Sequence, residues 1–166
     1  KAVESNYPPA ITQLAYLNLH GAHVEKDIGK AIKLFIKASK LDLKNSTPDR
    51  KLAEIYSNEI FKHGIDQAEF QFQQGKKSKA EYEATIKSYK TYDYTNYYDI
   101  KKAISSAEKC IQKEFGFGCY LKIINYYSEK KFNNIDYEEA LMWLNEAEEI
   151  LKKSDYYSTI LTTKGW

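Results

Sequence analysis

The stretch DIGKAI at residues 27–32 returns as DIKKAI at residues 99–104 and, more loosely, as DYEEAL at residues 136–141. Each copy places an aspartate four positions before an alanine, and a second small residue follows each alanine seven positions later. The small-residue pairs are Ala31 and Ala38, Ala103 and Cys110, and Ala140 and Ala147. Small residues seven apart lie on one helix face and let a neighbouring helix approach closely. The sequence therefore predicts helices that repeat and pack through the same kind of face.

The spacing of these small residues sets the length of the repeat. The second members of the pairs are separated by 72 and then 37 residues, which predicts a unit of about 36 residues with one small residue missing near residue 74. Residues 1–9 are interpreted as the end of a preceding unit, so the natural chain is expected to continue upstream of Lys1. The predicted units are 10–45, 46–81, 82–117 and 118–153, followed by a terminal segment at 154–166.

Within the units the apolar residues follow helical rather than strand periodicity. In the first unit, one helix is predicted to end at Gly21 and a second to be capped by Asp27. One unit is thus predicted to be an antiparallel pair of helices. The second unit is irregular: a helix starts at 46–48, Gly64 interrupts its apolar stripe, and a further helix is predicted over 66–74.

The composition fits a helical protein and excludes several classes of function. Seven Gly and three Pro in 166 residues are too few for the many turns of an all-β sandwich. Arg50 is the only arginine beside 24 lysines, and a net charge of +2 provides no basic footprint. We therefore expect no nucleic-acid partner. No apolar run is long enough to cross a bilayer, so no membrane insertion is expected.

The first unit resembles a known repeat family. The residues that carry the resemblance are Ala10, Leu14-Ala15, Gly21, Val24, Lys26-Asp27, Lys30-Ala31 and Lys37-Ala38-Ser39. Together they look like a Sel1-like repeat, a relative of the tetratricopeptide repeat with units of about 36 residues. The third and fourth units resemble it too, whereas residues 46–77 do not. In the fourth unit Lys130 stands where the first has Gly21, so a rebuilt hairpin loop is expected.

This resemblance implies a fold and a general role. The fold is an all-α, right-handed α-solenoid of antiparallel helix hairpins, here of about four units. The role is a protein-binding scaffold, often in bacterial proteins that are exported or linked to secretion. By the same resemblance, an exported or periplasmic location is slightly favoured over the cytoplasm.

The two cysteines look like a junction between units in the cysteine-rich, secreted branch of Sel1-like proteins. In that branch each disulfide ties the two helices of one unit. The partners that this scheme implies for Cys110 and Cys119 fall near Tyr82 and Glu148, so the scheme cannot operate here. Two alternatives remain: a direct bridge between Cys110 and Cys119, or two buried free thiols that act as small apolar residues. We favour the free thiols.

A search for catalytic chemistry yields no recognisable site. His20 and His23 are three residues apart, but no carboxylate or thiol nearby completes a metal-ligand pattern. Glu138, Glu139 and Glu146 belong to a glutamate-rich helix whose charged face is interpreted as a solvated surface. No nucleophile elbow, phosphate-binding loop or dinucleotide fingerprint is present. We therefore expect no enzyme activity, no cofactor and no metal.

The tyrosines provide the candidate contact site. Of 15 tyrosines in the chain, four fall in or beside one predicted hairpin loop, where helix packing does not account for all of them. Tyrosine offers a large rigid contact area with a polar tip, as protein interfaces favour. The predicted partner-binding residues are Tyr92, Tyr94, Tyr97 and Tyr98.

The leading functional hypothesis is a non-enzymatic adaptor that binds a partner protein on the surface of the solenoid. One alternative is an immunity-type inhibitor of a secreted toxin, because Sel1-like proteins occur beside such effectors. Another is a metal-dependent enzyme that uses His20, His23 and the glutamate-rich helix. The sequence does not name the partner or the pathway.

Overall fold

The computed structural model describes residues 6–91, 94–113, 116 and 118–151, and these residues form eight α-helices and two short 3-10 helices. The α-helices are α1 (Pro8–His20), α2 (Ile28–Leu41), α3 (Thr47–Tyr56), α4 (Glu59–Gln73), α5 (Lys79–Thr91), α6 (Ile100–Ile111), α7 (Gly118–Ser128) and α8 (Tyr137–Leu151), and the 3-10 helices are η1 (Tyr94–Tyr97) and η2 (Lys130–Phe132). No β-strand occurs in these ranges, so the expected all-α fold is confirmed. No helix in the described part of the chain is long and apolar enough to span a bilayer.

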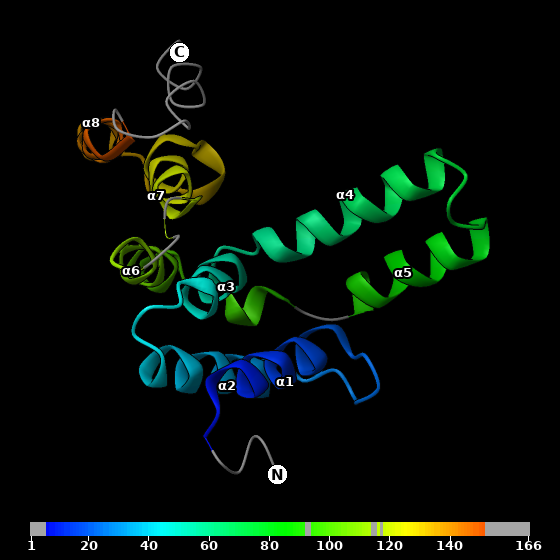
Figure 1. Ribbon diagram of the computed structural model, residues 1–166. Coiled ribbons are helices and arrows are strands. Elements are labelled where there is room, and N and C mark those ends of the chain that lie inside the picture. Colours follow the sequence, from blue (N-terminus) through cyan, green and yellow to red (C-terminus); the bar gives the residue numbers. More distant parts are fainter. Residues whose placement is uncertain (1–5, 92–93, 114–115, 117, 152–166) are drawn as a thin grey trace.

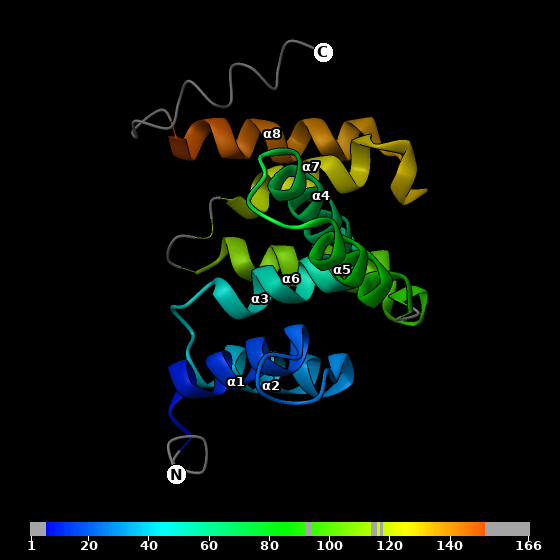
Figure 2. The ribbon, with the colours of Figure 1, turned by 90° about the vertical axis from the view of Figure 1, so that its right-hand side faces the viewer.

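Three antiparallel helix pairs lie one upon another and form what we call the stack. The pairs are α1/α2, α3/α6 and α7/α8, and Figure 2 shows them in this order from one end of the molecule to the other. Helix α2 contacts α3, and α6 contacts α7, so each pair packs on the next. Layered helix hairpins of this kind form an α-solenoid, as the resemblance implied.

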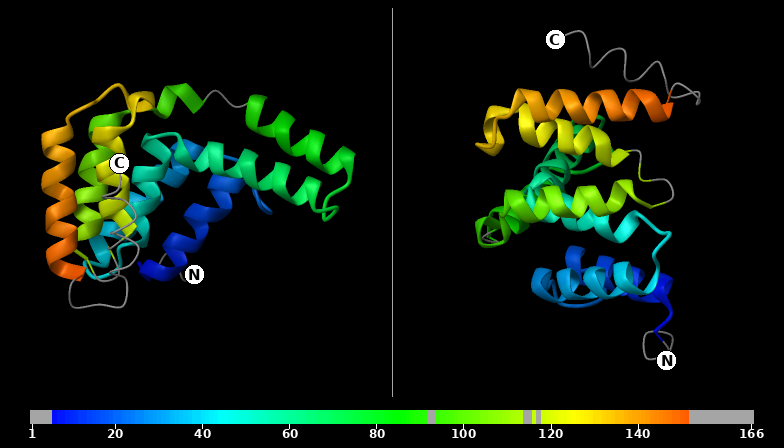
Figure 3. Two further views of the ribbon diagram at one scale, coloured as in Figure 1. Left: turned by 90° about the horizontal axis from the view of Figure 1, so that it is seen from above. Right: turned by 90° about the vertical axis from the view of Figure 1, so that its left-hand side faces the viewer.

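The remaining pair, α4/α5, lies beside the stack, and we call it the arm. Figures 1 and 3 show that the arm projects from the middle layer, on the side where α1, α3 and α7 lie. The arm is inserted between the two helices of the middle pair, because α3 ends at Tyr56 and its partner α6 begins at Ile100.

The division into equal units at 46–81 and 82–117 therefore differs from the way the helices pair. Helices α3 and α6 form one hairpin across both ranges, with the arm between them. An insertion about as long as one repeat leaves the same spacing as a further repeat, so spacing alone could not distinguish the two. No small packing residue stands at the position expected near residue 74, because Gln74 follows the last residue of α4 and is exposed.

The second helices of the three stacked pairs are alike, as predicted. Asp27, Asp99 and Asp136 precede them, and each carboxylate accepts a hydrogen bond from the backbone N–H three residues later, at 2.8, 3.1 and 3.0 Å. The predicted small residues Ala31, Ala38, Ala103, Cys110, Ala140 and Ala147 are all buried. Aspartate caps thus start each helix, and small side chains bring it close to its neighbours.

The hairpin loops differ between the first and last pairs, as the sequence predicted. Gly21 ends α1 in the left-handed conformation, with φ of 71°. The last pair has no glycine at this place. Its loop contains η2 instead, and Asn133 takes the left-handed conformation with φ of 49°. Lys130 stands where the first pair has Gly21, and asparagine adopts a positive φ more readily than lysine does. The left-handed turn therefore moves to Asn133.

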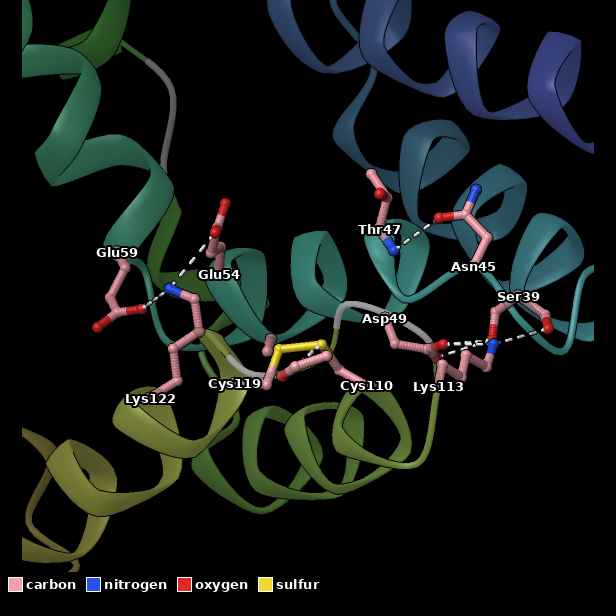
Figure 4. Close-up of a disulfide and its surroundings, with 12 residues drawn as sticks. Ser39, Asn45, Thr47, Asp49, Glu54, Glu59, Cys110, Lys113, Cys119 and Lys122 are labelled. Atoms are coloured by element: carbon pink, nitrogen blue, oxygen red, sulfur yellow. Dashed lines mark hydrogen bonds and ion pairs between the residues drawn. A yellow bond between two sulfur atoms is a disulfide. The ribbon is translucent and has the colours of Figure 1, made fainter. Parts of the chain in front are cut away.

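Cys110 and Cys119 form a disulfide that joins the end of α6 to the start of α7 (Figure 4). Both residues are fully buried, and the described residues contain no free cysteine. The free thiols that we favoured are therefore wrong, and the direct bridge is the correct alternative. The connection between the helices is tight: a Cβ added at Gly116 would overlap the carbonyl group of Cys110. A larger residue would therefore not fit at position 116.

A buried ion pair lies beside the disulfide and joins the first and second layers. The Lys113 ammonium is 2.6 Å from the Asp49 carboxylate, and the two side chains are 9% and 2% exposed. The Ser39 hydroxyl donates to Asp49 at 2.7 Å, and Lys113 donates to the carbonyl oxygens of Ser39 and Asp42 at 3.0 and 3.3 Å (Figure 4). Because both charges are buried and fully hydrogen-bonded, this cluster fixes the end of α2 against α3 and α6.

Candidate functional site

The arm and the stack enclose a cleft of about 550 Å³, which is the candidate functional site. Its walls come from α1, α3 and α7 of the stack, from both helices of the arm, and from η2. The lining residues are His20, Lys51, Glu54, Glu59, Ile60, Lys62, His63, Gly64, Asp66, Gln67, Tyr89, Lys122 and Lys131. The cleft thus lies on the side of the first helices of the pairs, and it exists because the arm projects there.

A chain of ion pairs crosses the stack wall of the cleft. Lys51 lies 2.6 Å from Glu54, and Lys122 lies 3.4 Å from Glu54 and 2.9 Å from Glu59. Figure 4 shows Lys122 of α7 between the two glutamates of α3 and α4. Burial alone would raise the pKa of Glu54, but the nearby ammonium groups of Lys122 and Lys51 outweigh burial and hold the pKa below its usual value. Glu54 therefore stays charged at neutral pH, and the four side chains pair with one another.

Tyr126 contacts this wall from the core of the stack. Its ring is fully buried in the stack core, and its hydroxyl lies 3.3 Å from both the Ser57 hydroxyl and the Glu59 carboxylate. Burial and the negative charge of Glu59 raise the pKa of Tyr126, so the phenol keeps its proton and donates. Through Glu59, the base of the arm is held against α7.

The arm meets the first layer through an aromatic contact. Tyr89 of α5 packs over Gly64 of α4, where an added Cβ would overlap the tyrosine ring. The Lys26 ammonium lies 4.9 Å from the centre of the same ring, a cation–π arrangement. Gly64 does not interrupt the helix as the sequence suggested: α4 continues through it from Glu59 to Gln73. The glycine instead allows the two arm helices to approach closely.

The exposed part of the cleft lies along α4. Lys62, His63 and Asp66 are exposed there, and no ion pair joins Lys62 or Asp66 to another described residue. Phe70 follows on the same helix face, one turn beyond Asp66, and is 58% exposed. The outer wall therefore carries charges of both signs, and a large apolar side chain lies one turn beyond it.

The histidines that the sequence singled out do not form a metal site. His20 stacks on the Tyr16 ring with 6.2 Å between ring centres, and it lines the cleft together with His63, whereas His23 does not. No group of three or more His, Cys, Asp or Glu side chains within the described ranges is arranged to hold a metal ion. Partial burial, then the positive charges of Lys26 and Lys51, lower the pKa of His20. Its imidazole is thus neutral at pH 7.

Of the predicted tyrosine site, the structure describes only the side chains of Tyr97 and Tyr98. Tyr92 lies outside the described residues, and Tyr94 begins η1 with a side chain outside the described part. Tyr97 is half-buried and packs on the core between α1, α2 and α3. Tyr98 is 39% exposed, and its hydroxyl donates to the Phe132 carbonyl at 3.0 Å. The two described side chains therefore contact different layers of the stack.

Sequence reasoning missed the cleft because its residues are far apart in the chain. Lys51 and Glu54 form an ordinary helix-surface pair, and nothing local links them to Lys122. The one available signal was the poor repeat match of residues 46–77. A segment that departs from the pattern of its neighbours is a candidate insertion, and insertions in solenoids often serve binding.

Comparisons with known proteins agree with the helix pairs described above. The family model for the Sel1 repeat matches residues 8–43, which contain α1 and α2, and residues 131–149, which contain most of α8. No curated protein matches the chain. Among solved structures, the chain is similar to the crystal structure of a Sel1 repeat protein from Oxalobacter formigenes, at 19% identity and a TM-score of 0.33, over 90% of this chain and 61% of that one. This chain thus spans 61% of the length of that protein.

Proposed function

Because the chain is a Sel1-like repeat protein, we propose that it is a non-enzymatic scaffold that binds a segment of a partner protein in the cleft between the stack and the arm. Sel1 repeats are generally protein-interaction modules. The observation that carries the proposal is the open cleft of about 550 Å³, walled by helices from all three layers of the stack and from the arm.

The chemistry of the cleft suits a polypeptide. Its inner wall consists of charges that already satisfy one another, so it neither attracts nor repels a charged ligand strongly. Its outer wall offers Lys62 and Asp66 to opposite charges on the partner. Phe70 lies one helix turn beyond the lining residues and offers an apolar contact at the edge of the cleft. Interfaces gain affinity from apolar contacts and gain specificity from paired charges.

A binding assay with matched variants tests this proposal. The intact chain is used as bait for bacterial extracts, and captured proteins are identified by mass spectrometry. Lys62→Glu combined with Phe70→Ala is expected to reduce capture of the specific partner at least about tenfold, because both contacts are removed. Lys79→Glu is the control, since Lys79 is 79% exposed at the start of α5 and outside the cleft. Equal capture by the cleft variant and the control would reject the cleft.

The tyrosines at 92, 94, 97 and 98 are a second proposed contact surface. Within it, Tyr98→Ala is the informative change, because Tyr97 packs in the core and its removal would also destabilise the stack. Loss of partner capture with unchanged helical circular dichroism would support this surface. Unchanged capture would reject it.

A separate proposal concerns the compartment in which the protein acts. We propose that the chain acts in an oxidising compartment, because its two cysteines are paired in a buried disulfide. Mass spectrometry after alkylation of protein from its native cells tests this, and free thiols would contradict it.

The immunity-type alternative is tested by co-expression with toxins encoded nearby, where rescue of growth would favour an inhibitor over a scaffold.

A further inference from the structure

The second helices of the stack differ sharply in charge. Helix α2 contains four lysines and no acid, and α6 contains three lysines and one glutamate, Glu108. Helix α8 contains five glutamates and no base. Figures 1 and 2 show α2 and α8 in the two outer layers of the stack, with α6 in the layer between. The two ends of one molecule therefore carry opposite charge on the same side, away from the arm.

The basic end contains a groove of about 270 Å³ between α2, α3 and α6. Its rim carries the exposed lysines Lys40, Lys102 and Lys109. Lys102 is paired with Asp99 at 3.0 Å, whereas Lys40 and Lys109 form no ion pair with another described residue. The floor is largely apolar, with Ile36, Leu52 and Tyr56, and its one acid, Asp49, is neutralised by Lys113.

The acidic end presents a matching helix face. Glu138, Leu141, Met142, Asn145 and Glu149 lie on one exposed face of α8. Leu141 and Met142 at its centre are 53% and 49% exposed, and glutamates lie at both ends. An apolar centre between acidic ends complements an apolar floor between lysines. The lengths also match: the 15 residues of α8 extend about 22 Å, and the 14 residues of α2 about 21 Å.

We propose that α8 of one molecule docks in the α2/α3/α6 groove of a second copy of this chain. Charge complementarity between the two ends selects this occupant over an unrelated partner. The contact joins different surfaces of the two copies, so it is heterologous and extends into chains rather than closing a dimer. A single helix in a groove buries less area than a stable dimer requires, so the association is weak and depends on concentration.

Sedimentation velocity of the intact chain tests this contact. The wild-type chain is expected to associate as its concentration rises. Raising the salt from about 0.1 M to about 1 M shortens the Debye length from about 10 Å to about 3 Å and should weaken association about tenfold. Two variants, Lys40→Glu with Lys109→Glu in the groove and Glu138→Lys with Met142→Lys on α8, should each remain monomeric.

Mixing the two variants provides the decisive measurement. Each variant keeps one intact surface, so the mixture should associate at concentrations at which either variant alone stays monomeric. Lys76→Glu with Lys79→Glu, at the outer end of the arm, is the matched control and should associate like the wild type. A wild-type chain that stays monomeric, variants that associate like the control, or a mixture that stays monomeric would each overturn the proposal. Capture of an acidic protein by a wild-type chain that stays monomeric would also overturn it.

Discussion

The stack and the arm are both built from helix pairs, but they are held together differently. In the stack, the small residues on one face of each second helix are buried. Contacts between α2 and α3 and between α6 and α7 join the layers. In the arm, only Phe61 and Ala68 of α4 are buried, and none of the described α5 side chains is. The difference indicates that the stack is the cooperative unit and that the arm is an appendage whose helices open more easily.

The strongest test of this comparison removes a buried charge from the stack. Lys113→Ala leaves the Asp49 carboxylate buried without its partner, which should lower the free energy of unfolding by about 3–5 kcal/mol. Chemical denaturation followed by circular dichroism measures the change. Lys102→Ala, whose side chain is 64% exposed in its pair with Asp99, is the control and should cost far less than Lys113→Ala. Equal losses in the two variants would contradict a buried anchor at Lys113.

The disulfide is expected to have the next largest effect. Cys110 and Cys119 close a loop of nine residues, and losing that constraint on the unfolded chain should cost about 2–3 kcal/mol. The variant is Cys110→Ala with Cys119→Ala, and its stability is compared with that of the wild type before and after reduction. Reduction should affect only the wild type. If the wild type loses no stability on reduction, the bridge does not support the joint between α6 and α7.

One substitution made in both regions compares them directly. Ala107 of α6 and Ala68 of α4 are 0% and 2% exposed. Ala107→Leu should overpack the stack and cost about 1–3 kcal/mol globally, whereas Ala68→Leu should cost less than about 1 kcal/mol. Hydrogen exchange should show lost protection across the stack in the first variant and only in the arm in the second. Lost protection across the stack after Ala68→Leu would mean that the two regions unfold together.

The smallest expected effect is the pH dependence at the boundary between the two regions. The pKa of His20 is lowered in the folded protein by partial burial and by Lys26 and Lys51. The unfolded chain therefore binds a proton near the ordinary histidine value of about 6.5 while the folded chain does not. Stability should fall as the pH drops below about 6.5, by less than about 1 kcal/mol because the ring is partly exposed.

His20→Gln is the variant for this test, and denaturation across the pH range measures it. The variant should lose the change that begins below about pH 6.5 and keep the loss at lower pH, where Glu54 becomes protonated. Because the pKa of Glu54 is lowered in the folded state, its contribution is lost as the pH falls through that lowered value. Identical profiles for variant and wild type would show that His20 is not perturbed by its neighbours.

Much of the stack was predictable from the sequence, whereas the candidate site was not. The aspartate caps and the small residues can be recognised in the sequence, because capping involves one helix turn and the small residues share one helix face. The alternative for Cys110 and Cys119 that we favoured was wrong, since pairing depends on how close folding brings the end of α6 to the start of α7. The cleft residues Lys51 and Lys122 come close to each other only in the folded protein, so no local sequence pattern could link them.

Local patterns along the chain were enough to identify an α-helical repeat protein and the buried face of each second helix. Periodicity and capping are local properties, so they are visible along the chain. The pairing of α3 with α6, and the arm that the residues between them form beside the stack, become visible in the folded chain. An insertion and a further repeat of equal length have the same spacing and similar helical patterns. They differ in which distant helix supplies the buried contacts, and that is a property of the folded chain.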